Sequence, residues 1–180
     1  MSRYTSFSVE LTGAVDAFQA MQAVPRRILQ AQKRALGTVQ RRLGTEAKRD
    51  IGAEYNLKAS RIAQGLMVRN TTDGIKLIGR SRGINAIEFR GTWSRRMKGG
   101  ARYAIKRGGD RSGRDGAFIA RGKNGARLMF ERAGDKRLPL RAVYGPSIGQ
   151  MLKHGRRPER LAEFALRILQ SEQKRLLGTT

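Results

Sequence analysis

The spacing of hydrophobic residues changes twice along the first third of the chain. Residues 6–11 alternate between apolar and polar side chains, which predicts a half-buried strand. Residues 15–23 predict a short apolar helix. From Pro25 onward apolar residues recur at intervals of three, four and seven, which predicts a long amphipathic helix over residues 25–52 with Gly52 as its end.

Two glycines, Gly37 and Gly44, lie inside this long helix. Each weakens a helix by about 1 kcal/mol relative to alanine. Either the helix tolerates this loss of stability, or the two glycines form a stripe on which another backbone packs closely.

A strand-rich region follows a short helix predicted over residues 57–66. Asp73-Gly74 is a hairpin signal between two short apolar runs, and Asn124-Gly125 is a second one. The remaining extended stretches are residues 86–90, 102–107, 117–120, 127–132 and 138–143.

The chain returns to helical spacing after Gly145-Pro146. Ser147 is placed to cap a short helix around residues 148–152. A C-terminal helix is predicted over residues 158–177, with Gly178 beyond it.

This order predicts an α+β fold, in which the long N-terminal helix and the C-terminal helix pack on a mainly antiparallel sheet with a flexible basic arm. We expect one domain over residues 1–180. Its predicted parts are an N-terminal strand and short helix (1–24), the long helix (25–52), a strand-rich core (66–143) with the arm (91–116), and C-terminal helices (145–177).

A sheet face needs a helix stripe to cover it, so one buried cluster is expected to join the strands to the C-terminal helix. Its expected members are Phe118, Leu128, Phe130, Leu140, Phe164 and Ile168. Leu138, Leu140 and Val143 are expected to alternate into the same core.

The net charge of the chain indicates what kind of partner it binds. The 180 residues carry 38 Lys and Arg against 14 Asp and Glu, a net charge of +24, and Arg outnumbers Lys. Such an imbalance indicates an anionic partner: nucleic acid, an acidic protein surface or a membrane. No apolar run is long enough to span a bilayer and no secretion signal opens the chain, so we expect a cytoplasmic protein and no membrane partner.

Catalytic and metal chemistry find little support. Cysteine is absent and His154 is the one histidine, which argues against thiol, disulfide and multi-histidine metal sites. The acidic residues form no cluster of the kind that holds magnesium, and Asp50 is expected to offset neighbouring cations on its own helix. We predict no enzyme activity, no cofactor and no metal; His154 is interpreted as a surface residue.

The most unusual segment is the basic arm, residues 91–116, which holds seven glycines. Its candidate contact residues are Trp93, Arg95, Arg96, Lys98, Arg102, Lys106, Arg107, Arg111 and Arg114. Three interpretations stay open: an arm that lies on phosphates with Trp93 stacking, a solvated mobile loop, and an arm that orders against a neighbouring subunit. The third is preferred.

A second basic stripe recurs every seven residues on the long helix, at Arg27, Arg34, Arg41 and Lys48. A surface facing DNA is one interpretation. A solvated face opposite the core is the preferred one.

Five short motifs in order carry a family resemblance. They are Gly116-Ala117-Phe118-Ile119-Ala120, Asn124-Gly125, Phe130-Glu131-Arg132, Leu138-Pro139-Leu140 and Tyr144-Gly145-Pro146-Ser147-Ile148. This series resembles the minor tail protein Z family of long-tailed bacteriophages. Gly116, Phe118, Tyr144, Gly145, Pro146 and Ser147 are the residues taken as the family motif.

The resemblance implies a structural tail-completion protein in the virion, at the head-proximal end of the tail and assembled in the host cytoplasm. It implies a homo-oligomeric ring, expected to be a hexamer, that helps join tail to head around the DNA channel. The implied partners are further copies of the chain, the tail tube or tail terminator protein, the head–tail connector protein and the end of the genome DNA.

Two other functions are alternatives to this one. A small basic nucleic-acid-binding protein of ribosomal or chromatin type would explain the charge, but it has no reason to carry the five motifs. A nuclease-like enzyme is disfavoured by the scarcity of histidine and of acidic clusters.

Overall fold

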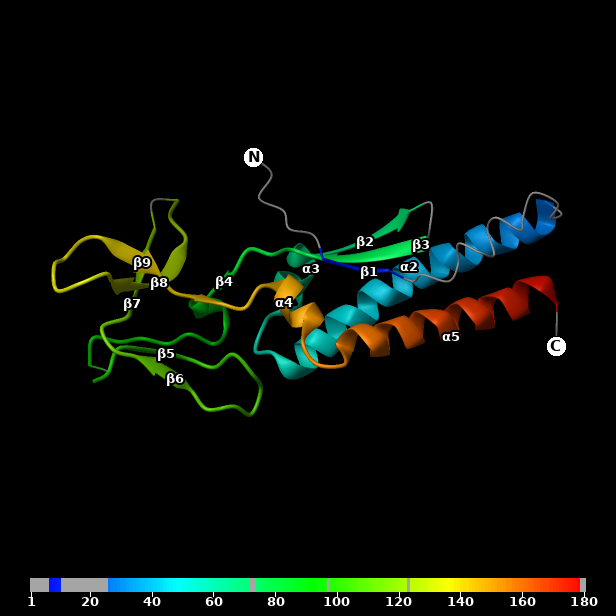
Figure 1. Cartoon of the computed structure of the whole chain (residues 1–180). Helices are drawn as coiled ribbons and strands as arrows, with labels where there is room; N and C mark the ends of the chain where they lie inside the picture. The colour runs from blue at the N-terminus through cyan, green and yellow to red at the C-terminus, as the bar shows by residue number, and fades with distance from the viewer. Residues whose placement is uncertain (1–6, 11–25, 72–73, 97, 123, 179–180) are drawn as a thin grey trace.

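The computed structural model describes residues 7–10, 26–71, 74–96, 98–122 and 124–178 of the 180-residue chain. Two long helices, α2 (Arg26–Glu54) and α5 (Arg157–Leu177), lie side by side at one end of an elongated molecule (Figure 1). Short helices α3 (Ala59–Gly65) and α4 (Ile148–Lys153) lie near the middle. Most of the small strands occupy the other end.

The strands form four small antiparallel sheets rather than one. The first has the order β1-β3-β2 and packs on α2. Its strands are β1 (Phe7–Glu10), β2 (Leu66–Thr71) and β3 (Gly74–Gly79). The others pair β4 (Ile84–Asn85) with β10 (Tyr144–Gly145), β5 (Ala101–Tyr103) with β6 (Ser112–Arg114), and β7 (Phe118–Arg121) with β8 (Arg127–Arg132) and β9 (Leu140–Ala142).

The predicted α+β class is therefore confirmed, and so are most of its elements. Strand β1, the hairpins β2–β3 and β7–β8, and helices α3, α4 and α5 lie where the sequence predicts them. The helix predicted over residues 15–23 lies outside the described residues. No helix in the described ranges is both long and apolar enough to cross a membrane.

Helix α2 continues past Gly52, so the predicted end at Gly52 is wrong. The amide of Tyr55 still donates to the carbonyl of Ile51 at 2.9 Å. A Cβ at Gly52 would lie 3.5 Å from Cδ1 of Ile62, an ordinary van der Waals distance. The buried residues of α2 recur every fourth position: Ala31, Ala35, Val39, Leu43, Ala47 and Ile51.

The stretch predicted as a strand over residues 86–90 is a 3-10 helix, η2 (Ala86–Glu88). The cause is Asn85, a buried residue whose Oδ1 accepts from the amides of Ile87 at 3.2 Å and Met129 at 2.8 Å. Its Nδ2 donates to the Met129 carbonyl at 3.2 Å. The Asn85 side chain thus stabilises the 3-10 turn that follows it and connects this turn to β8.

The core is divided, which makes the predicted single cluster wrong. A larger cluster joins α2, α4 and α5 to β3, and a smaller one in the strand-rich end contains Ala86, Ala101, Ala117, Met129 and Val143. Phe164 and Ile168 pack against the larger cluster, because α5 lies on α2 and not on the strands.

Two predicted core leucines are exposed. Leu138 is 67% exposed and Leu140 is 37% exposed, whereas Val143 is buried as expected. The face of β9 that was expected to meet α5 is therefore left open.

The two glycines inside α2 have different surroundings. A Cβ at Gly37 would meet nothing within 4 Å, while a Cβ at Gly44 would lie 3.1 Å from Cγ2 of Val68 on β2. Gly44 therefore marks a close approach between helix and sheet, and Gly37 does not.

We expect Gly37→Ala to raise the free energy of unfolding by about 0.5–1 kcal/mol, because alanine is the better helix former and has room. Gly44→Ala should gain less or lose stability, since Val68 must move. Urea denaturation of both variants measures the difference; a larger gain at Gly44 than at Gly37 would contradict the packing described.

Candidate partner and nucleic-acid interface

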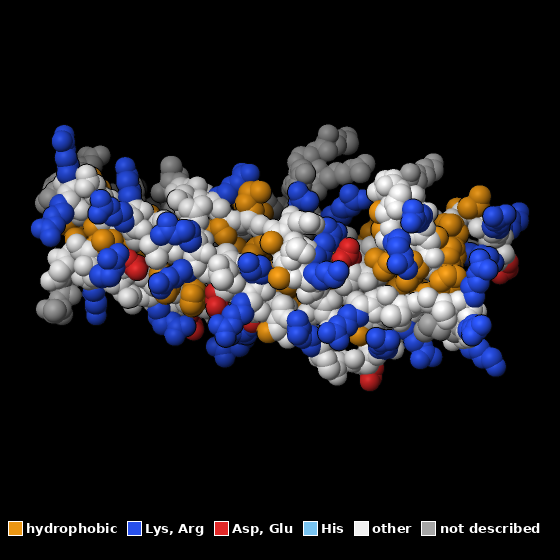
Figure 2. Space-filling view, turned by 180° about the vertical axis from the view of Figure 1, so that it is seen from behind, with side chains coloured by type: hydrophobic (Ala, Val, Ile, Leu, Met, Phe, Trp, Pro, Cys, Tyr) orange, Lys and Arg blue, Asp and Glu red, His pale blue; other side chains and the backbone are white. Residues whose placement is uncertain are grey.

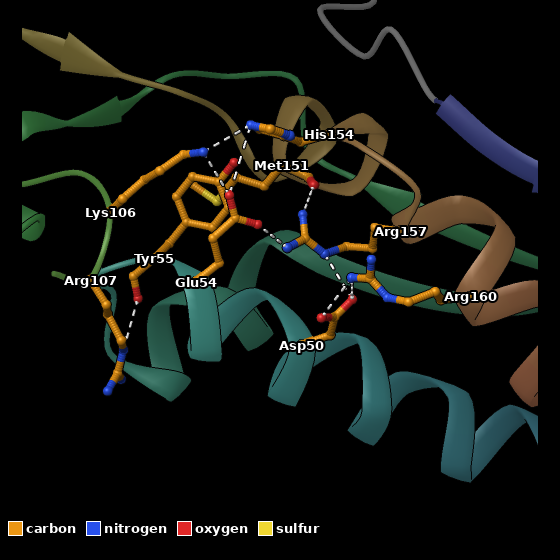
Figure 3. Close-up of polar contacts among 9 residues, drawn as sticks. All are labelled: Asp50, Glu54, Tyr55, Lys106, Arg107, Met151, His154, Arg157 and Arg160. Atoms are coloured by element: carbon orange, nitrogen blue, oxygen red, sulfur yellow. Dashed lines mark hydrogen bonds and ion pairs between the residues drawn. The ribbon is translucent and has the colours of Figure 1, made fainter. Parts of the chain in front are cut away.

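A buried arginine ties the helices together where they meet the strands (Figure 3). Arg157, at the start of α5, is 1% exposed. Its Nε lies 3.0 Å from Oδ2 of Asp50 and its Nη2 lies 2.6 Å from Oε2 of Glu54, both on α2. Its Nη1 donates to the carbonyl of Met151 on α4. One guanidinium therefore joins three helices.

The carboxylates of this cluster have second partners. Arg160 Nη2 lies 2.8 Å from Oδ2 of Asp50. Lys106 Nζ lies 2.9 Å from Oε1 of Glu54. The expectation that Asp50 offsets cations of its own helix is wrong, because the cations that meet it come from α5.

Tyr55 and His154 complete the cluster. The Tyr55 ring lies under the Arg157 guanidinium, 5.7 Å from its carbon, and contacts the His154 ring edge-on at 6.4 Å. His154 Nε2 lies 3.2 Å from Lys106 Nζ and 3.8 Å from Oε1 of Glu54. A carboxylate does reach the histidine through the fold, but two cations already hold it, which fits a structural role.

Electrostatics follow from this arrangement. Burial alone would raise the pKa of Glu54, but hydrogen bonds from Lys106 and Arg157, with their charges, outweigh it and hold the pKa below its ordinary value. Burial, together with the Glu54 charge, raises the pKa of Tyr55. The hydrogen bond to Glu54 raises the pKa of Lys106. Near neutral pH the Glu54 carboxylate and the Lys106 ammonium therefore stay ionised, and the Tyr55 phenol stays neutral.

The same cluster anchors the basic arm to α2. Asn56, which is buried, donates through Nδ2 to the carbonyls of Ala104 at 3.0 Å and Lys106 at 2.8 Å. The amide of Arg107 donates to the Glu54 carbonyl at 2.8 Å. The middle of the arm is thus fixed to the end of the long helix.

Within the single chain the arm is folded around the β5–β6 hairpin. Ala101 is buried in the smaller cluster, and Thr92 and Arg102 exchange backbone hydrogen bonds at 2.8 and 2.9 Å. The predicted mobility of the arm in a free subunit stays a prediction.

The cations of the arm fall into two groups. Lys106 and Arg114 form ion pairs, the latter with Glu131 at 2.6 Å. Arg107 and Arg111 make hydrogen bonds of 3.5 and 3.4 Å to Tyr55 O and Thr92 Oγ1. The side chains of the remaining arm cations have no polar partner among the described residues; they are Arg95, Arg96, Lys98 and Arg102, all exposed.

Trp93 does not stand free for stacking. It is half-buried, packs against the smaller cluster and lies 6.3 Å from the Phe118 ring. It thus connects the arm to the sheet β7–β8–β9.

That sheet has one face with almost no polar side chain. Strand pairing and the two-residue alternation place six apolar residues and Arg132 on it. The six are Phe118, Ala120, Leu128, Phe130, Leu140 and Ala142, none of them buried. We call this set the apolar sheet face. Figure 2 shows hydrophobic side chains gathering at this end of the molecule, among Lys and Arg side chains that cover its whole length.

The second basic stripe lies on α2 as expected. Arg27, Arg34 and Arg41 are exposed and Lys48 is half-buried. The stripe and the four unpartnered arm cations belong to different elements.

The motif residues have structural roles. Gly116 has a φ of 72°, which suits glycine, in the turn before β7. A Cβ at Gly145 would lie 2.7 Å from the Phe89 ring, so glycine is needed there. Ser147 caps α4 in a reciprocal pair with Gln150, at 3.1 and 2.9 Å, as predicted. Tyr144 is 52% exposed and Pro146 is half-buried.

No group of three or more potential metal-ligating side chains occurs within the described ranges. Sequence reasoning missed Arg157, Asp50 and Glu54 as a unit. The available signal was the four-residue spacing of the two carboxylates at the end of the long helix, which places them on one face.

Acid should weaken the ion pairs that join α2 to α5, because it protonates Glu54. Its pKa is lowered in the folded state, so the unfolded chain binds the proton first, and stability falls as pH drops below its ordinary value of 4.5. We expect Glu54→Gln to lower the free energy of unfolding at pH 7 and to flatten its decline between about pH 5 and pH 3.

The control is Glu163→Gln, an exposed position on α5 without a partner in the described structure. Its pH profile should follow that of the wild-type chain. Urea unfolding at each pH measures both variants, and parallel profiles for Glu54→Gln and the wild type would refute the linkage.

The family comparison gives the context for this surface. Residues 11–158 match the model of the family described as prophage minor tail protein Z (GPZ). Comparisons with curated proteins and with solved structures return no match. The matched segment includes α2, the basic arm, the sheet β7–β8–β9 and α4. The chain therefore belongs to the prophage minor tail protein Z family, and it is a structural protein of the phage tail and so of the virion.

Proposed function

We propose that this protein completes the tail at its head-proximal end, as a homo-oligomeric ring around the DNA channel that helps join tail to head. Six copies are the preferred number. Its other partners are the tail tube or tail terminator protein, the head–tail connector protein and the end of the genome DNA.

The observation that carries this proposal is the apolar sheet face. It leaves Phe118, Leu128, Phe130 and Leu140 partly in water, and the chain's own helices pack elsewhere. Burial of apolar surface stabilises by about 25 cal/mol per Å², so a neighbour that covers the face gains directly. Such a face in a tail protein supports contact with an adjacent subunit or tail component.

The charge supports a position beside DNA. The chain carries a net charge of +24, and the side chains of four arm cations have no partner within the described part of the chain. A ring that surrounds DNA needs cations that hold phosphates without reading bases.

Membership of a tail protein family favours this function over a ribosomal or chromatin-type role. The charge alone suits both. The two differ in whether the chain assembles on tails.

The first test concerns assembly. We expect native mass spectrometry of the purified chain to show oligomers, and labelling of tails to place the chain at the head-proximal end. Leu140→Glu should shift the mass toward monomer, because it puts a charge on the apolar sheet face. Leu166→Glu, at a 45% exposed site on α5, is the matched control and should leave the oligomer intact.

A monomer that ignores tails would overturn the proposed function. Label at the distal end of the tail would overturn the proposed position. Equal effects of the two leucine variants would remove the apolar sheet face from the assembly contact.

The second test separates two roles of the arm. Replacing Arg95, Arg96, Lys98 and Arg102 by Gln should impair joining of heads to tails if the arm meets acidic surfaces of a neighbour, which we prefer. If the arm holds DNA, the same variant should instead flatten the salt dependence of DNA binding by about 0.9 per lost phosphate contact. The control replaces Lys33, Arg42, Arg167 and Lys174, four exposed cations of α2 and α5.

A further inference from the structure

A cleft of about 550 Å³ lies where the end of α2 meets the strand-rich part. Its lining includes four cations, Lys58, Arg90, Arg107 and Arg127, and one carboxylate, Glu88. The cations come from four separate segments: the link between α2 and α3, the residues after η2, the basic arm and the start of β8.

These cations are nearly without partners. The side chains of Lys58, Arg90 and Arg127 have no hydrogen bond or ion pair within the described part of the chain. Among the described residues, the Arg107 side chain reaches only the Tyr55 carbonyl, at 3.5 Å. Like charges that converge in a recess repel one another and concentrate a positive potential, which an anion relieves.

The walls of the cleft are held in place by buried groups. Asn56 and Leu57 are buried and form part of the lining. Asn56 fastens the segment that carries Arg107, as described above. The positions of the cations therefore follow from the core and not from a loose surface loop.

Arg90 adds a second, independent sign. Its φ is 53°, and it is the one non-glycine residue with positive φ in the described ranges. The turn is closed by the amide of Gly91, which donates to the Ile87 carbonyl at 3.0 Å. L-residues other than glycine rarely adopt positive φ, and such strain concentrates at functional sites. An arginine occupies a position where glycine would fit the backbone better.

We propose that this cleft binds phosphodiester groups of nucleic acid. Arginine offers a planar fork of N–H donors that matches phosphate oxygens, and Lys58 supplies a further charge. Nucleic acid is favoured over an acidic peptide because the whole chain carries a net charge of +24. A polymer with a charge on every unit can use cations on either side of the cleft as well as those inside it.

The inference deepens the proposed function, yet it concerns a property of the free chain that is measured without tails. Its failure would leave the ring and its position untouched. Absence of the chain from the head-proximal end of the tail would in turn leave the proposal for the cleft valid.

The main test compares two variants that each lose three charges. Lys58→Gln, Arg90→Gln and Arg127→Gln together remove three of the four cations of the cleft, while Lys33→Gln, Arg167→Gln and Lys174→Gln remove exposed cations from α2 and α5. The probes are fluorescent 20-mers, one duplex and one single-stranded, read by anisotropy over a range of salt concentrations. Thermal unfolding checks that both variants are folded.

We expect the cleft variant to lose at least tenfold more affinity than the control at about 0.1 M salt, and to reduce the salt slope by about 2–3. The probe with the larger loss identifies duplex or single strand as the source of the phosphodiester. Equal losses in the two variants would overturn the proposal.

Arg90→Gly gives a readout that a purely structural residue would not. Glycine relieves the positive φ, so we expect unfolding to shift upward by about 2–4 °C while DNA affinity falls. A variant that binds DNA as tightly as the wild-type chain would contradict the assignment.

A poly-glutamate peptide tests the other class of occupant. If the cleft variant loses the peptide but keeps its DNA affinity, the cleft is a site for acidic protein and the nucleic-acid proposal is wrong. If it loses DNA more than peptide, the proposal stands.

Discussion

Burial of one charged guanidinium constrains the centre of this molecule. A buried charge is costly unless it is fully paired, so Arg157 requires Asp50, Glu54 and the Met151 carbonyl at fixed positions. That requirement sets how α2, α4 and α5 meet. Because the other oxygen of Glu54 holds Lys106, the same constraint extends from the core into the basic arm. The ion-pair cluster thus helps to fix the position of the basic arm, which is part of the candidate interface.

The sequence predicted local structure well and long-range packing poorly. Spacing and turn residues are local signals, and they located α5, the β7–β8 hairpin and the Ser147 cap. An amphipathic stripe, in contrast, shows that one face of a helix is buried, but it does not show which element covers that face. The stripe of α5 was expected to cover the strands, but it packs on α2. The curl at Asn85 depends on Met129, far along the chain, which no local pattern reveals.

The candidate site was predicted to a similar degree. Charge density identified the basic arm, and its four unpartnered cations were among those named. Pairing could not be foreseen for Lys106 or Arg114, because their partners lie on α2 and β8. The cleft cations Lys58, Arg90 and Arg127 escaped notice because they are isolated in sequence and become neighbours only in the fold. A positive φ at an arginine has no sequence signal.

The four-residue spacing on α2 has a consequence for local opening. Each step of four advances the stripe by about 40° around the helix, so its buried line winds instead of running straight. The line ends in Leu43 and Ile51 near the junction but begins with Ala31 and Ala35, which bury far less apolar surface. Opening should therefore require less free energy at the far end of the helical pair than at the junction. The helical pair would then be rigid where it meets the Arg157 cluster, while its far end could adjust to the curvature of its surroundings.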